Sequence, residues 1–408
     1  MGVQWKTRNK NSLHFLLTQM KHQLAVGIDI GTSLTRVVVC EQEAVGTALP
    51  RVLGTSTTPT RGLRHGYIIN RDEAVATLRQ AIAEAEKESG QRIRSASLCI
   101  GGIGLGAEYG NGTAMVTRAD SVISKLDIDK AISDAETKLD LKNKAILHAF
   151  PILFKVDDKE LPARPEGIQG FKLDVKVLFI TCFQQHLDDL LSVVHEAGVK
   201  VSSFTATPIA TEQVLLTDLQ RNFGCALIDI GAETVSVSVF ENGSLMSLHV
   251  FGIGSLEITK DIALGLRISP EDAENIKIGV VSFQSVPKKK LDEIIEARFS
   301  DIFELIDKYF KKIGRSGLLP AGAIIIGGGS QSPMIEQVAK TLLRIPVRTG
   351  FVEIPTTKSS LKDQRFLVAY GAAIGVIDRI PNKTTKHAAG APDGFMDTIK
   401  NFFKQLMP

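Results

Sequence analysis

Residues 26–39 read VGIDIGTSLTRVVV, and residues 227–240 read LIDIGAETVSVSVF. In each stretch an apolar run ends in Asp-Ile-Gly, at Asp29 and at Asp229, and a segment rich in β-branched residues follows. In the second copy, valine and serine alternate from 235 to 239, which is the two-residue period of a β-strand. We therefore predict that each stretch forms two strands joined by a tight glycine turn, and that the chain contains a duplicated unit.

A third glycine cluster follows another apolar run, in AIIIGGGS at residues 323–330. The next segment, 333–343, predicts a helix, with Pro333 suited to its first turn. A strand, a glycine-rich turn and a helix N-terminus together form a common cradle for phosphate groups. Such turns are also frequent without a ligand, so this cluster alone does not distinguish the two possibilities.

The remaining sequence shows the two periodicities of an α/β protein. Some segments repeat apolar residues on one helical face, and others are short apolar runs typical of buried strands. Residues 381–392 lack periodicity and predict a flexible linker. The predicted helices are 72–88, 129–139, 184–197 and 290–310, and the predicted strands are 96–100 and 176–182.

The composition excludes several classes of protein. Of the 408 residues, 44% are hydrophobic and 23% are charged, which is ordinary for a globular chain and excludes a disordered one. The net charge of +3 gives no reason to expect a nucleic-acid partner. Four scattered cysteines without a CxxC pair argue against a disulfide framework and against a zinc site. No apolar run reaches the roughly 18 residues that a membrane span needs.

The paired glycine turns suggest nucleotide chemistry. A triphosphate needs several converging backbone N–H donors, and glycine lets the chain approach closely. An Asp at the end of a strand can hold Mg²⁺, usually through water. Two such hairpins facing each other could clamp the β- and γ-phosphates of ATP, with Mg²⁺ between Asp29 and Asp229 and the third turn at the adenosine. The alternative is that each Asp only caps its turn, which is favoured for a single Asp but not for the pair.

This constellation resembles the superfamily of actin, the heat-shock chaperone ATPases and the sugar kinases. Over roughly residues 24–380 the chain resembles, more narrowly, the family of the bacterial cell-division protein FtsA. The segments that carry the resemblance are RGLRHGYII at 61–69, LHAFPILFKVDD at 147–158, GIGSLEITKDIALGLRISPEDAENIK at 252–277, IIEARFSDIFEL at 294–305 and LPAGAIIIGGG at 319–329.

The resemblance implies an α/β, actin-like, two-lobed fold with duplicated cores of the RNase H type. It also implies a small α/β subdomain inserted in the first lobe and a C-terminal amphipathic helix. The expected parts are a basic N-terminal tail at 1–23, the first lobe at 24–96 and 181–223, the insert at 97–180, the second lobe at 224–380, the linker at 381–392 and the terminal helix at 393–408.

Carried over by position, the resemblance implies a site for ATP and Mg²⁺. The expected cofactor-binding residues are Asp29, Gly31, Thr32, Ser33 and Arg36 of the first phosphate loop, Asp229, Gly231 and Thr234 of the second, Glu274 and Lys277 at the adenosine or ribose, and Gly327, Gly328, Gly329 and Ser330 of the adenosine loop. Asp29 and Asp229 are the expected metal-holding residues.

Two positions depart from the family pattern. Glu233 stands where the second loop usually has glycine, so that either its carboxylate points away from the phosphates or nucleotide binding is weak. Thr207 stands where relatives carry a Gln or Glu that positions the attacking water, and a Thr hydroxyl is too short for that role. We therefore expect ATP binding to survive better than hydrolysis, with at most a weak ATPase activity.

The carboxyl end, DGFMDTIKNFFKQLM at 393–407, predicts an amphipathic helix. The family resemblance favours insertion of this helix into the membrane surface over docking on the protein itself or on a partner. Two Asp and two Lys make the helix neutral, so attraction to anionic lipid is expected to be weak within it. For the basic tail at 1–23 two alternatives remain: a merely disordered extension, which is favoured, or a segment that supplies the missing charge. The expected membrane-facing residues are Phe395, Met396, Ile399, Phe402, Phe403 and Leu406.

The resemblance further implies the partners of the protein. They are the terminal peptide of the tubulin-like filament protein FtsZ, other copies of the chain in filaments, membrane lipid and later division proteins, at the cytoplasmic side of the inner membrane where the septum forms. FtsZ peptides are acidic and apolar, and the basic residues expected to bind them are Lys288, Lys289, Lys290 and Arg298. The alternatives are a type IV pilus assembly scaffold of the same superfamily and, with less support, a sugar or acetate kinase.

Overall fold

The computed structural model describes residues 23–378 except 43–48, 162, 281–287 and 358–359. Its first lobe is built on a five-stranded sheet with the order β11-β6-β1-β2-β3. Strands β1, β2 and β3 are antiparallel neighbours, whereas β6 runs parallel to β1 and β11 runs parallel to β6. The strands are β1 Gln23–Ile30, β2 Leu34–Gln42, β3 Arg51–Pro59, β6 Ser95–Ile100 and β11 Lys200–Ala206.

The second lobe repeats this pattern. Its sheet has the order β14-β13-β12-β15-β16. Strands β12, β13 and β14 are antiparallel neighbours, and β15 and β16 follow in parallel. The strands are β12 Cys225–Ile230, β13 Val235–Glu241, β14 Ser244–Phe251, β15 Ala323–Ile326 and β16 Val347–Thr349. The predicted duplication is thus confirmed, because the two glycine-turn hairpins, β1–β2 and β12–β13, occupy equivalent places in two equivalent sheets.

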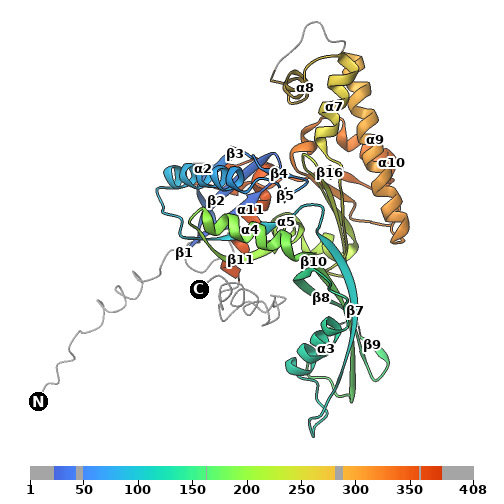
Figure 1. The fold of residues 1–408 in the computed structure, drawn as a ribbon. Helices are drawn as coiled ribbons and strands as arrows, with labels where there is room; N and C mark the ends of the chain where they lie inside the picture. The colour runs from blue at the N-terminus through green and yellow to red at the C-terminus, as the bar shows by residue number, and fades with distance from the viewer. Residues whose placement is uncertain (1–22, 43–48, 162, 281–287, 358–359, 379–408) are drawn as a thin grey trace, which may run out of the picture.

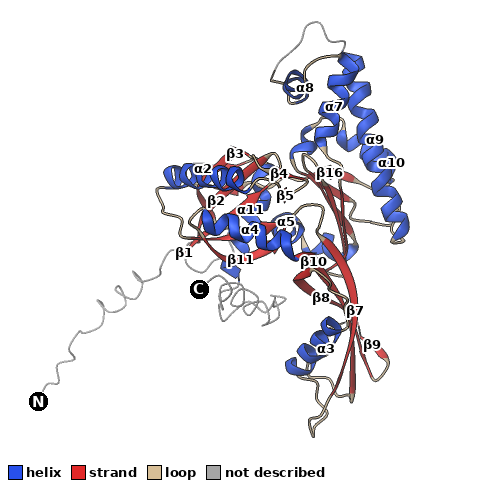
Figure 2. Ribbon diagram, viewed as in Figure 1, coloured by secondary structure: helices blue, strands red, loops and turns tan. Residues whose placement is uncertain are grey.

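Helices cover the sheets (Figures 1 and 2). In the first lobe, α2 packs on β2 and β3 and contacts α4, whereas α11 packs on β1 and β2 and contacts α5. In the second lobe, α9 contacts α7 and α10, and its apolar side contributes Phe299, Phe303 and Phe310 to the core. The helices are α2 Arg71–Ser89, α3 Lys125–Thr137, α4 Gln184–Glu196, α5 Thr207–Leu215, α6 Asp218–Phe223, α7 Ser255–Leu266, α8 Pro270–Lys277, α9 Lys288–Lys312, α10 Ile335–Leu343 and α11 Leu367–Asp378.

A separate four-stranded sheet, β7-β10-β8-β9, projects from the body of the molecule and carries α3 (Figure 1). Its strands are antiparallel, and its small core is closed by the alternating apolar side of β10 against α3. The expected boundary at residue 97 falls within β6, which belongs to the first sheet, and the separate sheet begins at Gly106. The strands are β7 Gly106–Met115, β8 Lys144–Val156, β9 Lys159–Leu161 and β10 Lys172–Phe183.

The remaining short elements lie around the lobes. The hairpin of β4 Leu63–Arg64 and β5 Tyr67–Ile68 precedes α2, and the pair β17 Ile354–Pro355 and β18 Ser360–Leu361 precedes α11. Two 3₁₀ turns are Gly328–Gln331 and Gln364–Phe366. Among the described residues, no helix is both long enough and apolar enough to cross a membrane.

Most predicted elements are confirmed, and one is corrected. The predicted helix at 333–343 begins at Ile335, with Met334 as its N-cap, so Pro333 is not in its first turn. Gly327 has a φ of 88°, so the chain does not continue from β15 directly into a helix. It first forms the 3₁₀ turn Gly328–Gln331. The predicted tail apart from Gln23, the linker and the terminal amphipathic helix lie outside the described residues.

We predict that Gly27→Ala destabilises the first lobe. Gly27 lies on β1 under α11, and a Cβ there would be 1.8 Å from the carbonyl oxygen of Ala369. Because helix backbone cannot yield as a flexible side chain can, the free energy of unfolding should fall by about 1–3 kcal/mol in urea denaturation. The control is Gly106→Ala, where the nearest atom would be 4.0 Å away and little change is expected. Equal stability of both variants would contradict this packing.

Candidate functional site

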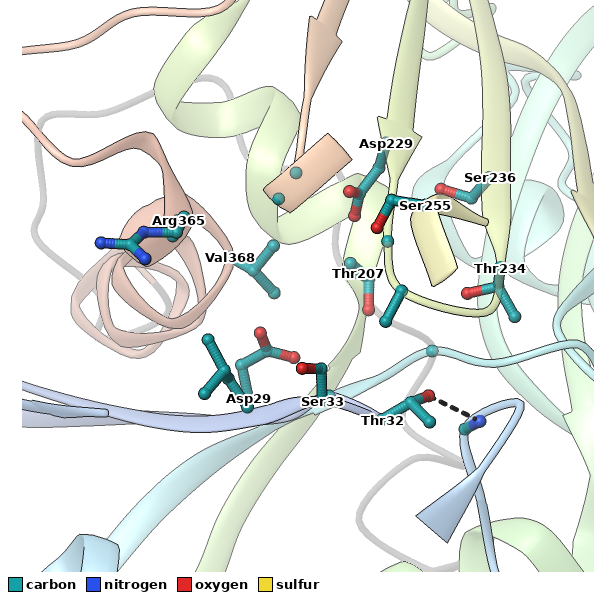
Figure 3. A pocket seen from close by; sticks show the side chains of 18 of the residues that line it. Asp29, Thr32, Ser33, Thr207, Asp229, Thr234, Ser236, Ser255, Arg365 and Val368 are labelled. Atoms are coloured by element: carbon teal, nitrogen blue, oxygen red, sulfur yellow. Dashed lines mark hydrogen bonds between the residues drawn. The ribbon is translucent and has the colours of Figure 1, made fainter. Parts of the chain in front are cut away.

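A pocket lies between the lobes, where the turns of the two glycine hairpins face each other (Figure 3). Asp29 near the end of β1 and Asp229 near the end of β12 both line it. The two hairpins can face each other because the lobes pack together, with side chains of α5 and of the second sheet in one shared hydrophobic core. The pocket is thus made by the tertiary structure from segments 200 positions apart in the sequence.

The pocket brings together twelve of the fourteen residues expected to bind the cofactor. Gly329 and Ser330 do not line it. Ser330 is buried and donates its hydroxyl to the carbonyl oxygen of Gly327 at 2.7 Å, so it shapes the third turn from behind. The twelve are Asp29, Gly31, Thr32, Ser33, Arg36, Asp229, Gly231, Thr234, Glu274, Lys277, Gly327 and Gly328.

Sequence reasoning missed a fourth glycine turn. Gly101 and Gly102 follow β6 and line the pocket, as do Gly327 and Gly328, which follow β15. The duplication itself was the available signal, because β6 is parallel to β1 just as β15 is parallel to β12. Ser255, Gln364 and Arg365 also line the pocket, and no pattern in the sequence pointed to them.

The negative charges of Asp29 and Asp229 are destabilised by their surroundings, and the pKa values of both carboxyl groups are raised. Burial raises the pKa of Asp29, and the neighbouring Arg36, whose Nη1 is 3.7 Å from the Asp29 Oδ2, opposes this. Burial, and then the charge of Asp29, raise the pKa of Asp229 to about 6. A cation placed between the two carboxylates would relieve both effects.

The lining fits an anionic ligand with a metal ion. Arg36 Nε is buried without a hydrogen-bond partner among the described residues, and so is Gln364 Oε1; both residues line the pocket. In the described part of the chain no three His, Cys, Asp or Glu side chains are placed so that they could hold a metal ion together, so a metal ion here would need phosphate oxygens and water in addition to the two carboxylates. Such coordination is what Mg²⁺ prefers when it accompanies a nucleotide.

The expected adenosine contacts, Glu274 and Lys277, form a pair at the edge of the pocket. Lys277 Nζ lies 2.6 Å from the Glu274 carboxylate and 2.8 Å from the Thr259 hydroxyl. Thr259 in turn donates to Glu274. This arrangement fixes two polar side chains of α8 against α7, where they can offer an acceptor and a donor to a ligand.

Glu233 does not line the pocket, and its carboxylate is engaged by the β4–β5 hairpin. The backbone N–H of His65, in the β4–β5 hairpin, donates to Glu233 Oε2 at 2.5 Å, and the His65 ring lies 3.2 Å from the Glu233 carbonyl oxygen. The same hairpin reaches the first phosphate turn, because the Gly66 N–H donates to the Thr32 hydroxyl at 3.1 Å, drawn dashed in Figure 3. The Glu233 side chain is thus directed to His65 and links the second lobe to the first, which agrees with the expected outcome in which its carboxylate points out of the pocket.

Thr207 stands at the start of α5 with its hydroxyl already engaged. The Thr207 Oγ1 donates to the Ile100 carbonyl oxygen at 3.1 Å. The residue lines the pocket, but its short side chain is bound to the end of β6. It therefore supports the Gly101–Gly102 turn and does not extend a polar group towards an attacking water.

The basic residues expected to bind a partner peptide differ in their surroundings. Arg298 on α9 forms a bidentate pair with Asp261 on α7, at 2.6 and 3.0 Å, and lies 3.2 Å from Asp301. Its guanidinium therefore joins two helices. Lys290 donates to the Gly265 carbonyl oxygen at 2.7 Å, whereas Lys288 and Lys289 are exposed at the start of α9.

Comparison with solved structures identifies the class of fold. The structure described as the PilM–PilN type IV pilus biogenesis complex has a TM-score of 0.65 and 17% identity, covering 87% of this chain and 99% of that one. The structure described as MreB 5 of Spiroplasma citri bound to AMPPNP has a TM-score of 0.50 and 11% identity, covering 95% and 100%. Together with the duplicated sheets and the pocket between them, they define an α/β protein with the actin-like fold.

Sequence comparison identifies the family. A profile described as "Cell division protein FtsA" matches residues 226–371, and one described as "SHS2 domain inserted in FTSA" matches residues 107–181. The cell division protein FtsA of Bacillus subtilis is 30% identical over 350 residues, covering 81% of this chain and 79% of that protein. The chain therefore belongs to the FtsA cell-division family, and its separate four-stranded sheet is the SHS2 insert of that family.

We predict that Asp229→Asn stabilises the ligand-free protein at neutral pH. An acid whose pKa is higher in the folded than in the unfolded state makes the folded protein bind more protons between the two values. The free energy of unfolding therefore loses a contribution as pH rises from about 4 to about 6, the pKa of Asp229 in the fold. The Asn variant should be more stable than the parent by about 1–3 kcal/mol at pH 7.5 and nearly equal at pH 4. A difference independent of pH, in urea titrations at both values, would contradict the shift.

We predict that Glu233 stabilises the protein without opposing nucleotide. Glu233→Ala removes a charge-assisted hydrogen bond to the His65 N–H and should lower the free energy of unfolding by about 1–3 kcal/mol. Glu233→Gln keeps an acceptor oxygen and should lose less. Since the carboxylate does not face the phosphates, ATP affinity of the Gln variant should change less than about threefold, which corresponds to well under 1 kcal/mol. A large gain in ATP affinity, measured with a fluorescent analogue, would show that the charge does repel the nucleotide.

Proposed function

We propose that this FtsA-family chain binds ATP with Mg²⁺ between its lobes and links FtsZ filaments to the cytoplasmic face of the cell membrane where the division septum forms. The observation that carries the nucleotide part is the facing pair of hairpins, with Asp29 and Asp229 across a pocket that also holds the unpaired Arg36 Nε. The division role rests on family membership.

In this proposal different residues of the pocket bind different groups of ATP. The turns at Gly31 and Gly231 offer backbone N–H groups to the β- and γ-phosphates, and Arg36 adds a positive charge. The two aspartates hold Mg²⁺, which neutralises the phosphates. Gly328 with Glu274 and Lys277 surrounds the adenosine. Thr207 leaves no side chain to orient water, so ATP acts as a ligand that organises the two lobes and turns over slowly at most.

The peptide of FtsZ is proposed to bind the second lobe beside the start of α9. Lys288 and Lys289 are exposed there, and large apolar side chains of the same region are exposed too: Leu264, Ile278 and Val280 are 77%, 54% and 69% accessible. An acidic and apolar peptide is complementary to such a surface. Arg298 is proposed to hold α9 on α7 through Asp261, so it positions this surface.

The remaining parts of the proposal rest on the family. The helix at 393–408 tethers the protein to lipid as a peripheral membrane protein, copies of the chain associate into filaments, and other division proteins join them. A pilus-assembly scaffold shares the fold, as the PilM–PilN structure does, but the sequence relatives are division proteins.

Sedimentation of FtsZ with lipid vesicles tests this function. FtsZ filaments should sediment with vesicles only when the protein is present. Phe402→Glu with Phe403→Glu places two carboxylates on the apolar face of the predicted helix, and the protein and FtsZ should both leave the vesicles. Lys288→Glu with Lys289→Glu should leave the protein on the vesicles and reduce FtsZ recruitment several-fold. Lys308→Glu, also on α9 but further along the helix, is the control. Recruitment of FtsZ by the Phe variant would contradict the tether.

A further inference from the structure

A second hollow lies on the first lobe, away from the nucleotide pocket. It is formed by the last turns of α2, the segment before β6 and the segment before β11. Its floor is apolar, with Ile82, Ile93 and Val199 buried. Its rim is basic, and the charged side chains that line it are Arg79, Lys87, Arg92, Arg94 and Glu86.

The basic side chains of the rim are available to a ligand. The side chains of Lys87, Arg92 and Arg94 are exposed and have no hydrogen-bond or ion-pair partner among the residues that the structure describes. The one acid, Glu86, accepts the backbone N–H of Ile93 at 2.7 Å, so its charge is partly satisfied within the fold. Arg79 donates to the Glu196 carbonyl oxygen.

Other acids of α2 do not neutralise the rim. Glu84 turns towards Thr58, and Glu88 accepts the N–H of Thr55 at 2.6 Å, so both are directed to β3. Glu196 pairs with Arg71, further back on α2. The hollow therefore presents four cations against one engaged carboxylate, which favours an anionic ligand.

The topology places the hollow at the amino edge of the sheet. Strands β1, β6 and β11 are parallel, so Gln23, Ser95 and Lys200 begin at one edge. The opposite, carboxyl edge carries Asp29 and the Gly101 turn of the nucleotide pocket. The hollow and the pocket thus lie on opposite edges of the same sheet.

Both ends of the described chain lie at this amino edge. Gln23 starts β1 there, and Figure 1 shows that start on the same side of the first lobe as the end of α2. Val368, in the first turn of α11, lines the nucleotide pocket at the carboxyl edge, and α11 crosses β1 at Gly27, where Ala369 and Ala373 lie. The helix therefore runs back along β1, and its end at Asp378 is directed to the amino edge.

From these observations we propose that the basic hollow faces the membrane and binds the headgroups of anionic lipids. This inference rests on the proposed tether, because the segment that carries the predicted amphipathic helix continues from Asp378. That helix is neutral, with two Asp and two Lys, so it gives the protein no preference for anionic lipid. The hollow supplies the preference from the folded domain, and it orients the first lobe with the nucleotide pocket away from the bilayer.

The test uses the full chain and vesicles of two compositions, neutral phosphatidylcholine alone and the same lipid with anionic phosphatidylglycerol. Arg92→Glu with Arg94→Glu is the variant, because both side chains are exposed and neither pairs with another side chain in the described part of the chain. The matched control, Lys125→Glu with Lys130→Glu, makes the same charge change on exposed positions of α3 in the insert. Melting temperatures check that both variants fold.

The parent protein should bind anionic vesicles more tightly than neutral ones, and added salt should remove the difference. The Arg variant should lose at least about 20-fold in partition onto anionic vesicles, as expected for two basic residues near such a surface. Its binding to neutral vesicles should be unchanged, and the control should behave as the parent. Arg92→Lys with Arg94→Lys should keep the preference, because charge and not guanidinium geometry is required.

Two results would overturn the proposal: a parent protein without preference for anionic lipid, or a preference that the Arg variant keeps. A soluble DNA duplex that competes with vesicles, and needs the same arginines, would also overturn it, because the hollow would then be a general polyanion site. Failure of the tether is seen separately, as absent binding to neutral vesicles by the parent. The preference for anionic vesicles can still be measured in that case.

Discussion

Two partly buried carboxylates near the ends of two equivalent strands are the constraint on which the rest of this structure depends. Asp29 and Asp229 come from separate lobes, and each raises the free energy of the other because both are removed from water. A chain that keeps such a pair needs a compensating cation, and here Arg36 compensates only partly, at 3.7 Å from one of them. The glycine turns around the pair leave space for a ligand that brings a metal ion and takes up the remaining donors.

The lobes are held in register by a small element between the phosphate turns. The β4–β5 hairpin donates one backbone N–H to Thr32 in the first lobe and another to Glu233 in the second. His65 adopts a positive φ of 49° in this hairpin, which aims its N–H at the carboxylate. A residue that departs from the family pattern thus serves as a contact between the lobes, and its carboxylate does not line the pocket.

The arrangement of functions on the molecule follows from the direction of the parallel strands. Turns that line the pocket collect at the carboxyl ends of β1, β6 and β11, which is where open α/β sheets generally bind ligands. The basic hollow lies at the amino ends of these strands, and both ends of the described chain lie there too. The proposed nucleotide site and the proposed membrane-facing surface therefore lie on the two opposite edges of one sheet.

The sequence by itself determined the local elements and the duplication. Alternating valines, the Asp-Ile-Gly turns and the helical stripes depend on spacing along the chain, so 72–88, 184–197 and both hairpins could be predicted. The sequence also held the Gly101–Gly102 turn, which the duplication could have identified. The start of α10 could not be predicted. Gly327 has a φ of 88° and is followed by a 3₁₀ turn, which the helix propensities of the residues do not reveal.

Only the tertiary structure decided what each polar side chain does. The hydrogen bond of Glu233 with His65 and the ion pair of Arg298 with Asp261 both join residues that are distant in the sequence. A hydrogen bond or an ion pair is fixed by distances of about 3 Å between atoms, and motif spacing carries no information at that scale. The basic hollow could not be predicted for the same reason. Its arginines come together only because the fold places the end of α2 and the segment before β6 at one edge of the sheet.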